Sequence, residues 1–350
     1  LASVRASLGR PSSRQPAPPW PLLLVAAAVA VLALLPLIYL TLRAIDGGTD
    51  ALEALARPRT VELVVSTLAL GGAVIIGSVS LGVPLAWLTV RTDLPARRAF
   101  SVLAIAPLAV PSYLLAFAFV GAFAPRGWLG GLGVTSVYGF WGAALVLSLA
   151  TMPYVVIATR AALMRLDPAT EEAARSLGRG PWAAARTAVL PVLVPAIGAG
   201  ALLACLYAIS DFGAVSILRY DTLATAIYSQ YRFSFDRSSA AALALLLLAL
   251  ALALVWAEGR IRRRLALATP HGRRRVPAPV RLGRWRIPAV LFCLAVAALA
   301  LGIPVATISL WLIDGLRANL PLAVGLDALG DSIVIAGAAA LLAVTLALPL

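Results

Sequence analysis

The chain has 350 residues, of which 61% are hydrophobic and only 13% are charged. An average soluble domain has roughly a quarter of its residues charged, so this composition excludes an ordinary soluble protein. The net charge is +14, and all 29 basic residues are Arg. Because the chain lacks Lys, it has no Walker A phosphate-binding loop and no Lys nucleophile or general base.

The first 19 residues are rich in Ser, Pro and Arg, a composition typical of a disordered tail. Eight apolar stretches follow, most of them long enough to provide the ~20 residues that cross a bilayer. By residue number they are 15–42, 63–90, 99–125, 138–159, 187–210, 238–257, 287–313 and an incomplete 332–350. Pro107 and Pro111 predict a kink in the third stretch. We therefore predict an all-α, polytopic membrane protein.

The Arg residues are unevenly distributed between the two ends of these stretches. If the N-terminus is cytoplasmic, 21 of the 29 Arg residues lie on the cytoplasmic side. This is the positive-inside pattern, and it predicts that orientation. Since the charge follows the membrane topology, it argues against nucleic acid as a partner.

A charged segment lies between the fourth and fifth stretches. Asp167 and Pro168 form a pair typical of a helix start, and Glu171 and Glu172 follow where negative charge suits the helix dipole. Gly178 can end this short helix. Such a short helix needs a partner surface to be stable. On residue types alone, a helix lying against lipid headgroups is an equal alternative.

The spacing Glu-Ala-Ala, three residues, Gly, and later Leu-Pro resembles the EAA loop of binding-protein-dependent ABC importer permeases. The matching residues are Glu171, Glu172, Ala173, Ala174, Gly178, Leu190 and Pro191. Ala188 departs from the pattern, because the family usually has Ile there. The resemblance implies a type I importer fold in the bacterial inner membrane, with the loop docked on a separate ATPase subunit. It also implies an extracytoplasmic substrate-binding protein as a second partner, and no ATP hydrolysis by this chain.

An internal repeat suggests two permease units. Residues 36–47 align with residues 304–315 at a shift of 268, and both segments end in Ile-Asp-Gly. Pro84-Leu85 matches Pro349-Leu350 at a shift of 265. The alternative is chance similarity among Ala- and Leu-rich spans.

The repeat predicts the domain organisation. We expect a first permease unit of six spans over residues 20–259, with its core at about 61–258. A basic cytoplasmic linker over residues 260–286 follows, and residues 287–350 begin a second unit with two spans. We expect the native chain to continue to a second Glu-Ala-Ala-like loop about 265 residues after Glu172.

Asp211 and Gly213 lie where the fifth stretch ends. A carboxylate in a membrane-spanning segment is costly unless it faces protein or water. Two roles stay open for Asp211: it lines the translocation path or braces the outer gate, or it caps a helix break beside Gly213.

Residues 210–237 contain Asp-Phe-Gly, Tyr-Asp-Thr and Phe-Asp-Arg, and this segment resembles ferric-iron ABC permeases in particular. The resemblance to ABC permeases in general covers about residues 61–258. Ferric iron is therefore the implied cargo. Thiamine and other small-solute permeases, which share the double-unit layout, are the alternative.

Nothing in the sequence predicts a catalytic, cofactor or metal site. His271 lies in the Arg-rich linker, and Cys205 and Cys293 are isolated in apolar stretches, typical of buried small hydrophobes. An ion-coupled secondary transporter would need charged groups near the midplane, for which Asp211 is the candidate. An intramembrane enzyme would need a His, Asp and Glu cluster that the sequence lacks.

Overall fold

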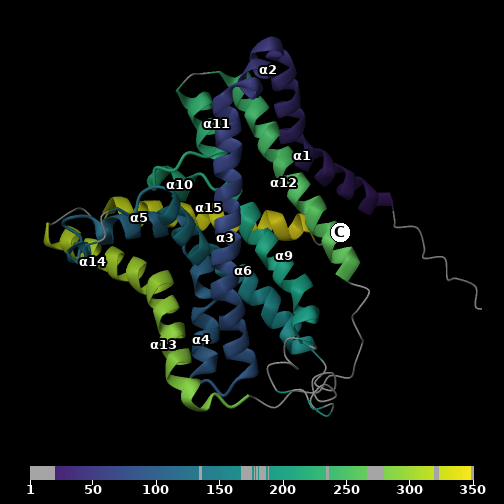
Figure 1. Ribbon diagram of the computed structural model, residues 1–350. Helices are drawn as coiled ribbons and strands as arrows, with labels where there is room; N and C mark the ends of the chain where they lie inside the picture. The colour runs from purple at the N-terminus through teal and green to yellow at the C-terminus, as the bar shows by residue number, and fades with distance from the viewer. Residues whose placement is uncertain are drawn as a thin grey trace, which may run out of the picture. The chain divides into compact units, whose positions relative to one another are not determined.

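The computed structural model describes residues 20–133, 136–166, 176, 178, 180, 187, 189–233, 236–265, 280–318 and 323–347. This part of the chain is helical apart from loops and one isolated β-bridge (Figure 1). The longer helices are α1 (Trp20–Asp46), α2 (Gly48–Ala56), α3 (Pro58–Arg91), α5 (Ser112–Phe123), α6 (Phe140–Arg165), α9 (Leu190–Ser210), α11 (Leu223–Arg232), α12 (Arg237–Leu265), α13 (Arg286–Ala297), α14 (Ile303–Arg317) and α15 (Ala323–Ala347). The shorter ones are α4 (Arg97–Leu103), η2 (Ala106–Ala109), η3 (Gly130–Leu132), α10 (Gly213–Ile217), η6 (Gly283–Trp285) and the π-helical η7 (Ala298–Gly302).

Within the described ranges, seven helices are long and apolar enough to cross a bilayer, or eight if a bent pair over residues 97–123 counts as one span. The all-α, multi-spanning fold predicted from the sequence is therefore confirmed. The last span begins at Asp327, before the predicted start at residue 332. The tail predicted over residues 1–19 lies outside the described residues.

The chain divides into a larger body, Thr41–Ala318, and a smaller body made of Leu1–Leu40 and Asn319–Leu350. The smaller body contains most of α1 and all of α15, two apolar helices with exposed side chains. The larger body contains α2 to α14, and so includes residues 287–318 of the predicted second permease unit, whereas residues 319–350 of that unit belong to the smaller body. The boundaries predicted from the repeat remain a prediction.

Three helices, α3, α6 and α9, form the centre of the larger body. In the middle helix, α6, 72% of an apolar 18-residue segment is buried, against 33% of the corresponding segment in α3 and 39% in α9. Both outer helices approach α6 through glycines at Val155: a Cβ at Gly82 would lie 2.9 Å from its Cβ, and one at Gly200 would lie 2.7 Å from its Cα. Small residues allow such close packing between membrane helices.

The third apolar stretch is not a straight helix. It forms α4, η2 and α5, and the chain bends by 99° between the two halves. Pro107 lies in η2, and Pro111 precedes α5 in an extended conformation with ψ of 140°. The bend confirms the kink predicted at these prolines. Its physical cause is that a proline disfavours helical geometry in the residue before it and removes a backbone donor.

The first span of the predicted second unit packs against α5 through α14. The ring of Trp311 on α14 contacts the Phe117 ring edge-on at 5.1 Å, and a side chain at Gly121 would collide with it. The Trp128 indole nitrogen donates a 3.0 Å hydrogen bond to the Thr307 hydroxyl. These contacts fix α14 within the larger body.

Candidate functional site

The two ends of the predicted coupling loop are held together by a small apolar cluster. Leu166, which follows α6, and Val189, which precedes α9, are both buried there. Leu163 of α6 and Leu193 of α9 pack in the same cluster, together with Ala86 of α3. The loop therefore leaves and re-enters the helical core at one place, where it contacts all three central helices.

Some residues of the loop motif can be placed in the structure. Glu171, Glu172, Ala173 and Ala174 lie outside the described residues, whereas Gly178, Leu190 and Pro191 are described and exposed. Gly178 has φ of +81°, a left-handed conformation that favours glycine. Leu190 and Pro191 begin α9, with proline in the first turn.

A polar contact ties α6 to α3 near the loop. The Arg160 guanidinium on α6 donates a 2.7 Å hydrogen bond to the Thr89 hydroxyl on α3. That hydroxyl in turn donates to the Leu85 carbonyl oxygen at 2.7 Å. The bond from Arg160 is charge-assisted and therefore stronger than a neutral hydrogen bond, so it helps to hold the two helix ends together.

At the opposite end of α9, the Asp211 carboxylate joins two breaks in the helices. One oxygen, Oδ1, accepts a 2.8 Å hydrogen bond from the Ala214 backbone N–H in α10. The other, Oδ2, accepts a hydrogen bond from the Ser112 hydroxyl at the start of α5. Asp211 therefore caps one helix and binds the first residue of another. Sequence reasoning found Asp211 and missed Ser112, although Pro111 marked the adjacent break.

Gly213 allows these two breaks to approach closely. A Cβ at Gly213 would lie 2.8 Å from the Tyr113 Cβ, closer than real Cβ contacts. Any larger side chain would push α10 away from α5. The structure thus brings Asp211 and Gly213 together at one junction with Ser112 and Tyr113, and we call these four residues the helix-break junction.

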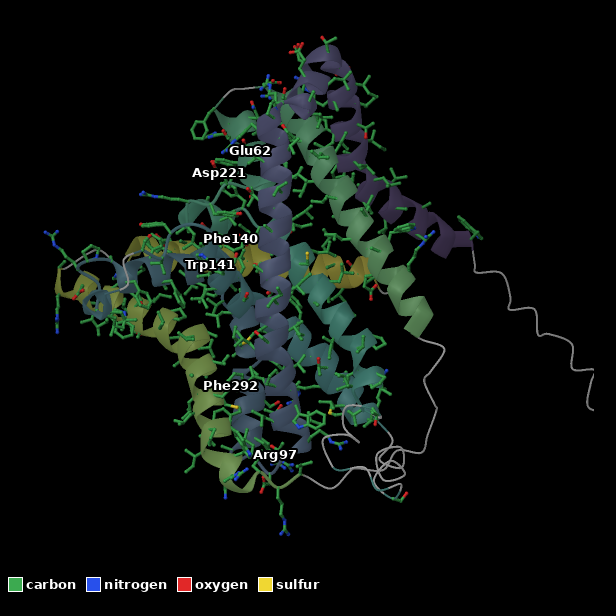
Figure 2. All side chains as sticks on the ribbon, viewed as in Figure 1. Glu62, Arg97, Phe140, Trp141, Asp221 and Phe292 are labelled. Atoms are coloured by element: carbon green, nitrogen blue, oxygen red, sulfur yellow. The ribbon has the colours of Figure 1, made fainter. Side chains whose placement is uncertain are left out.

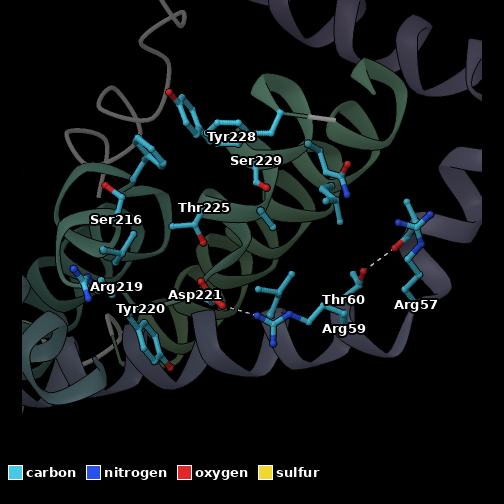
Figure 3. A pocket seen from close by; sticks show the side chains of 18 residues that line it. Arg57, Arg59, Thr60, Ser216, Arg219, Tyr220, Asp221, Thr225, Tyr228 and Ser229 are labelled. Carbon is cyan, nitrogen blue, oxygen red and sulfur yellow. Dashed lines mark hydrogen bonds and ion pairs between the residues drawn. The ribbon is translucent and has the colours of Figure 1, made fainter. Parts of the chain in front are cut away.

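An open cavity of about 560 Å³ lies beyond this junction, bounded by α2, α3, α10 and α11 (Figure 3). Asp221 points toward Arg59 across the cavity, and the two side chains form a 2.5 Å ion pair. The Tyr220 hydroxyl donates a 3.2 Å hydrogen bond to the Ser66 carbonyl oxygen on α3. Tyr220 and Asp221 belong to the segment that resembles ferric-iron permeases, and here they attach that segment to α3.

A second carboxylate near the cavity has a structural role. Asp236 precedes α12, and its Oδ1 accepts a 3.0 Å hydrogen bond from the Ser239 backbone N–H. The neighbouring Ser239, through its hydroxyl and its backbone N–H, lowers the pKa of the Asp236 carboxyl. This arrangement is an N-cap, which stabilises the start of α12.

Comparison with known proteins gives the family. A family model described as "Binding-protein-dependent transport system inner membrane component" matches residues 78–267. That range is more than half of the chain and contains the predicted coupling loop and all four residues of the helix-break junction. The chain belongs to this family.

Two curated relatives differ in cargo. The Fe(3+)-transport system permease protein FbpB 2 of Haemophilus influenzae is 34% identical over 341 residues, which are 95% of this chain and 65% of that protein. The molybdenum transport system permease protein ModB of Escherichia coli K12 is 30% identical over 158 residues, 44% of this chain and 69% of ModB. The chain thus spans about two thirds of the length of either relative.

A solved structure supports the same fold. A chain of a bacterial ABC transporter involved in the import of the acidic polysaccharide alginate superposes with a TM-score of 0.57 at 18% identity. The match covers 69% of this chain and 94% of the other. At that identity the likeness concerns the fold alone, which is that of a type I ABC importer permease.

Proposed function

We propose that this chain is the transmembrane permease of an ATP-driven importer that carries ferric iron across a bacterial inner membrane. The assignment of ferric iron as the substrate rests on the similarity to FbpB 2 over 95% of the chain. It extends past residue 267, where the family model ends, into α13 and α14. By contrast, a probable sulfate transport system permease protein of Chlorokybus atmophyticus matches 57% of the chain, and the molybdenum relative matches 44%.

The arrangement of α6 and α9 suggests how a motion of the loop reaches the membrane. Leu166 and Val189 are buried in one cluster with Ala86, so a displacement of the loop moves the ends of both helices against α3. A separate ATPase subunit that binds the loop and closes on ATP supplies that displacement. Glu171 and Glu172 provide the charge of the docking surface, and Gly178 shapes its turn.

The far end of α9 connects this motion to the bent span. With 21 residues, α9 is about 30 Å long, close to the thickness of a bilayer core. Its last turn leads to Asp211, which binds Ser112 at the bend of 99°. Tilting of α9 therefore pulls on the start of α5, and in this proposal the helix-break junction forms part of the outer gate.

The proposed orientation places the loop in the cytoplasm and the cavity near Asp221 on the outer face. A substrate-binding protein then delivers cargo at the face opposite the ATPase. ATP and the loaded binding protein act through their different affinities for the inward- and outward-facing states.

Uptake measurements test the cargo. A strain that lacks the gene should lose uptake of radioactive ferric iron and keep normal uptake of thiamine, sulfate and molybdate. Loss of thiamine uptake with normal ferric uptake transfers the assignment to the thiamine class. Loss of sulfate or molybdate uptake instead transfers it to the oxyanion permeases.

An ion-coupled secondary transporter is the alternative from another class. It would use Asp211 as an ion site, but both carboxylate oxygens already accept hydrogen bonds from Ser112 and Ala214. In vesicles that contain the permease and the ATPase, our proposal expects uptake to stop without ATP. Uptake driven by an ion gradient alone would support the secondary transporter.

A further inference from the structure

The end of the larger body that carries Arg97 has a strongly basic surface built from two distant segments. Figure 2 shows Arg97 at this end, opposite the end with Glu62 and Asp221. Arg97 and Arg98 begin α4, and Arg281, Arg284 and Arg286 surround η6. All five Arg residues are exposed, and no ion pair is found for them among the described residues. We call these five residues the arginine patch.

Backbone hydrogen bonds hold the two segments of the patch together. Val280 forms an isolated parallel bridge with Thr92: its N–H donates to the Arg91 carbonyl oxygen at 2.7 Å, and its own carbonyl oxygen accepts from the Asp93 N–H at 3.2 Å. The Asp93 carboxylate then accepts a 2.8 Å hydrogen bond from the Leu282 N–H. The backbone positions that carry the Arg residues are therefore held together before any ligand arrives, which reduces the ordering cost of binding.

Apolar packing extends this attachment along α13. Phe100 of α4 and Ala289 and Cys293 of α13 are buried in the same core cluster. Phe100 and Leu103 also line one small cavity with Cys293, so the two helices lie side by side near the patch. Since Asp93 is the one carboxylate in residues 91–100 and 280–287, the surface has a large positive excess.

An apolar stripe leads away from the patch along α13. Ile287, Leu291 and Leu294 follow each other at helical spacing and are 72%, 59% and 49% exposed. Trp285, at the junction between stripe and patch, is also exposed, and Trp is enriched where membrane meets water. A basic surface that continues into an exposed apolar stripe fits a ligand with an anionic head and a hydrocarbon chain.

We propose that the arginine patch and the adjoining face of α13 form a preformed binding site for an anionic phospholipid. Its phosphate binds between the Arg residues of α4 and η6, and an acyl chain lies along Ile287, Leu291 and Leu294. An acidic protein surface would use the Arg residues and leave the stripe without a role. The site lies in the cytoplasmic leaflet if the orientation proposed above is correct, but the inference does not depend on the cargo.

Native mass spectrometry of the purified protein tests the site. Phosphatidylglycerol and phosphatidylcholine with identical chains are titrated separately. We expect the protein to prefer phosphatidylglycerol by at least about tenfold. The triple variant Arg97→Gln, Arg98→Gln, Arg284→Gln should weaken phosphatidylglycerol binding by up to about fivefold per Arg and leave phosphatidylcholine binding unchanged. A matched triple variant at the exposed Arg126, Arg232 and Arg317 should keep the preference.

A pair of substitutions at Asp93 separates a preformed site from diffuse attraction. Asp93→Ala and Asp93→Asn both raise the net charge by one, but an Asn side-chain oxygen can still accept from the Leu282 N–H. A preformed site predicts weaker phosphatidylglycerol binding in Asp93→Ala and unchanged or stronger binding in Asp93→Asn. Equal or stronger binding in Asp93→Ala would overturn the proposal.

Two further outcomes would also contradict it. If the wild-type protein shows no preference for phosphatidylglycerol, the site does not exist. If the triple variant keeps its lipid preference and loses an ATPase subunit that otherwise co-purifies, the arginine patch is a protein-binding surface.

Discussion

The two ends of α9 (Leu190–Ser210) differ in how many of their groups are bound within the chain. At the loop end, Val189 is buried, but Leu190 is 43% exposed and Gly178 is exposed with its turn in place. At the far end, both oxygens of Asp211 are bound within the chain, by Ser112 and Ala214.

This difference indicates what each end does. At the loop end, the apolar Leu190 and the turn residue Gly178 are exposed next to the buried Val189, as expected for a surface that binds another protein. A carboxylate whose hydrogen bonds are all made internally organises the fold around it. We therefore interpret the loop end as a docking surface and the helix-break junction as an internal brace. Substitutions at the first should weaken ATPase binding and transport together, and those at the second should reduce transport and stability while ATPase binding persists.

The largest expected effect is that of Glu172→Arg. Reversing this charge places a cation at the proposed docking surface, and such changes at a bound charge cost about 2–5 kcal/mol. We expect the ATPase to be lost on purification and transport to fall to background, with normal insertion in the membrane. Glu53→Arg, an equal charge change at an exposed residue of α2, is the control. Normal transport by Glu172→Arg with the ATPase attached would refute the docking role.

Gly213→Val should have a smaller effect, confined to the junction. The new side chain would overlap Tyr113, and overpacking of this kind costs about 1–3 kcal/mol. We expect slower transport and a lower melting temperature, while ATPase binding persists. Gly198→Val on α9 adds the same group where no neighbouring atom lies within 4 Å of the position that a Cβ would take, and should change little. Equal effects of the two variants would show that the close approach is unimportant.

Gly178→Val tests the turn of the loop. A β-branched residue with φ of +81° is strained by about 1–2 kcal/mol, so the docking surface should lose its shape. We expect weaker ATPase co-purification and slower transport. Asn tolerates positive φ, so Gly178→Asn should retain most of both activities. If Asn and Val are equally harmful, the backbone conformation of Gly178 is not what the ATPase requires.

Asp211→Asn should have the smallest effect. The Asn side-chain oxygen can still accept from the Ala214 N–H, and its amide can donate to Ser112, so we expect a loss below about 1 kcal/mol. Asp211→Ala leaves the Ala214 N–H and the Ser112 hydroxyl without this acceptor and should cost about 1–3 kcal/mol. Thermal unfolding and uptake assays measure both. A large loss of transport in Asp211→Asn would show that the charge itself is needed.

Much of the fold could be predicted from the sequence because the membrane imposes simple rules. Charge-free stretches located the spans, and α6 begins at Phe140, within two residues of the predicted start. Pro107 and Pro111 indicated the bend in the third stretch. Gly178, predicted to end a short helix, has the positive φ that is common for a glycine at such a position.

Contacts between distant segments could not be predicted in this way. Ser112 and Asp211 are separated by 99 residues, and neither local spacing nor hydropathy relates them. The same holds for the bridge between Thr92 and Val280 and for Trp311 against α5. These pairs are set by how the helices pack, which depends on the shape of side chains along the whole length of each helix.

The most direct test of the coupling account is ATP-dependent uptake of ferric iron by vesicles that contain the full-length permease, its ATPase and its loaded binding protein. We predict that iron accumulates only with ATP, that Glu172→Arg abolishes both uptake and ATPase binding, and that Gly213→Val slows uptake with the ATPase still bound. Accumulation without ATP, or wild-type uptake by Glu172→Arg, would contradict the account.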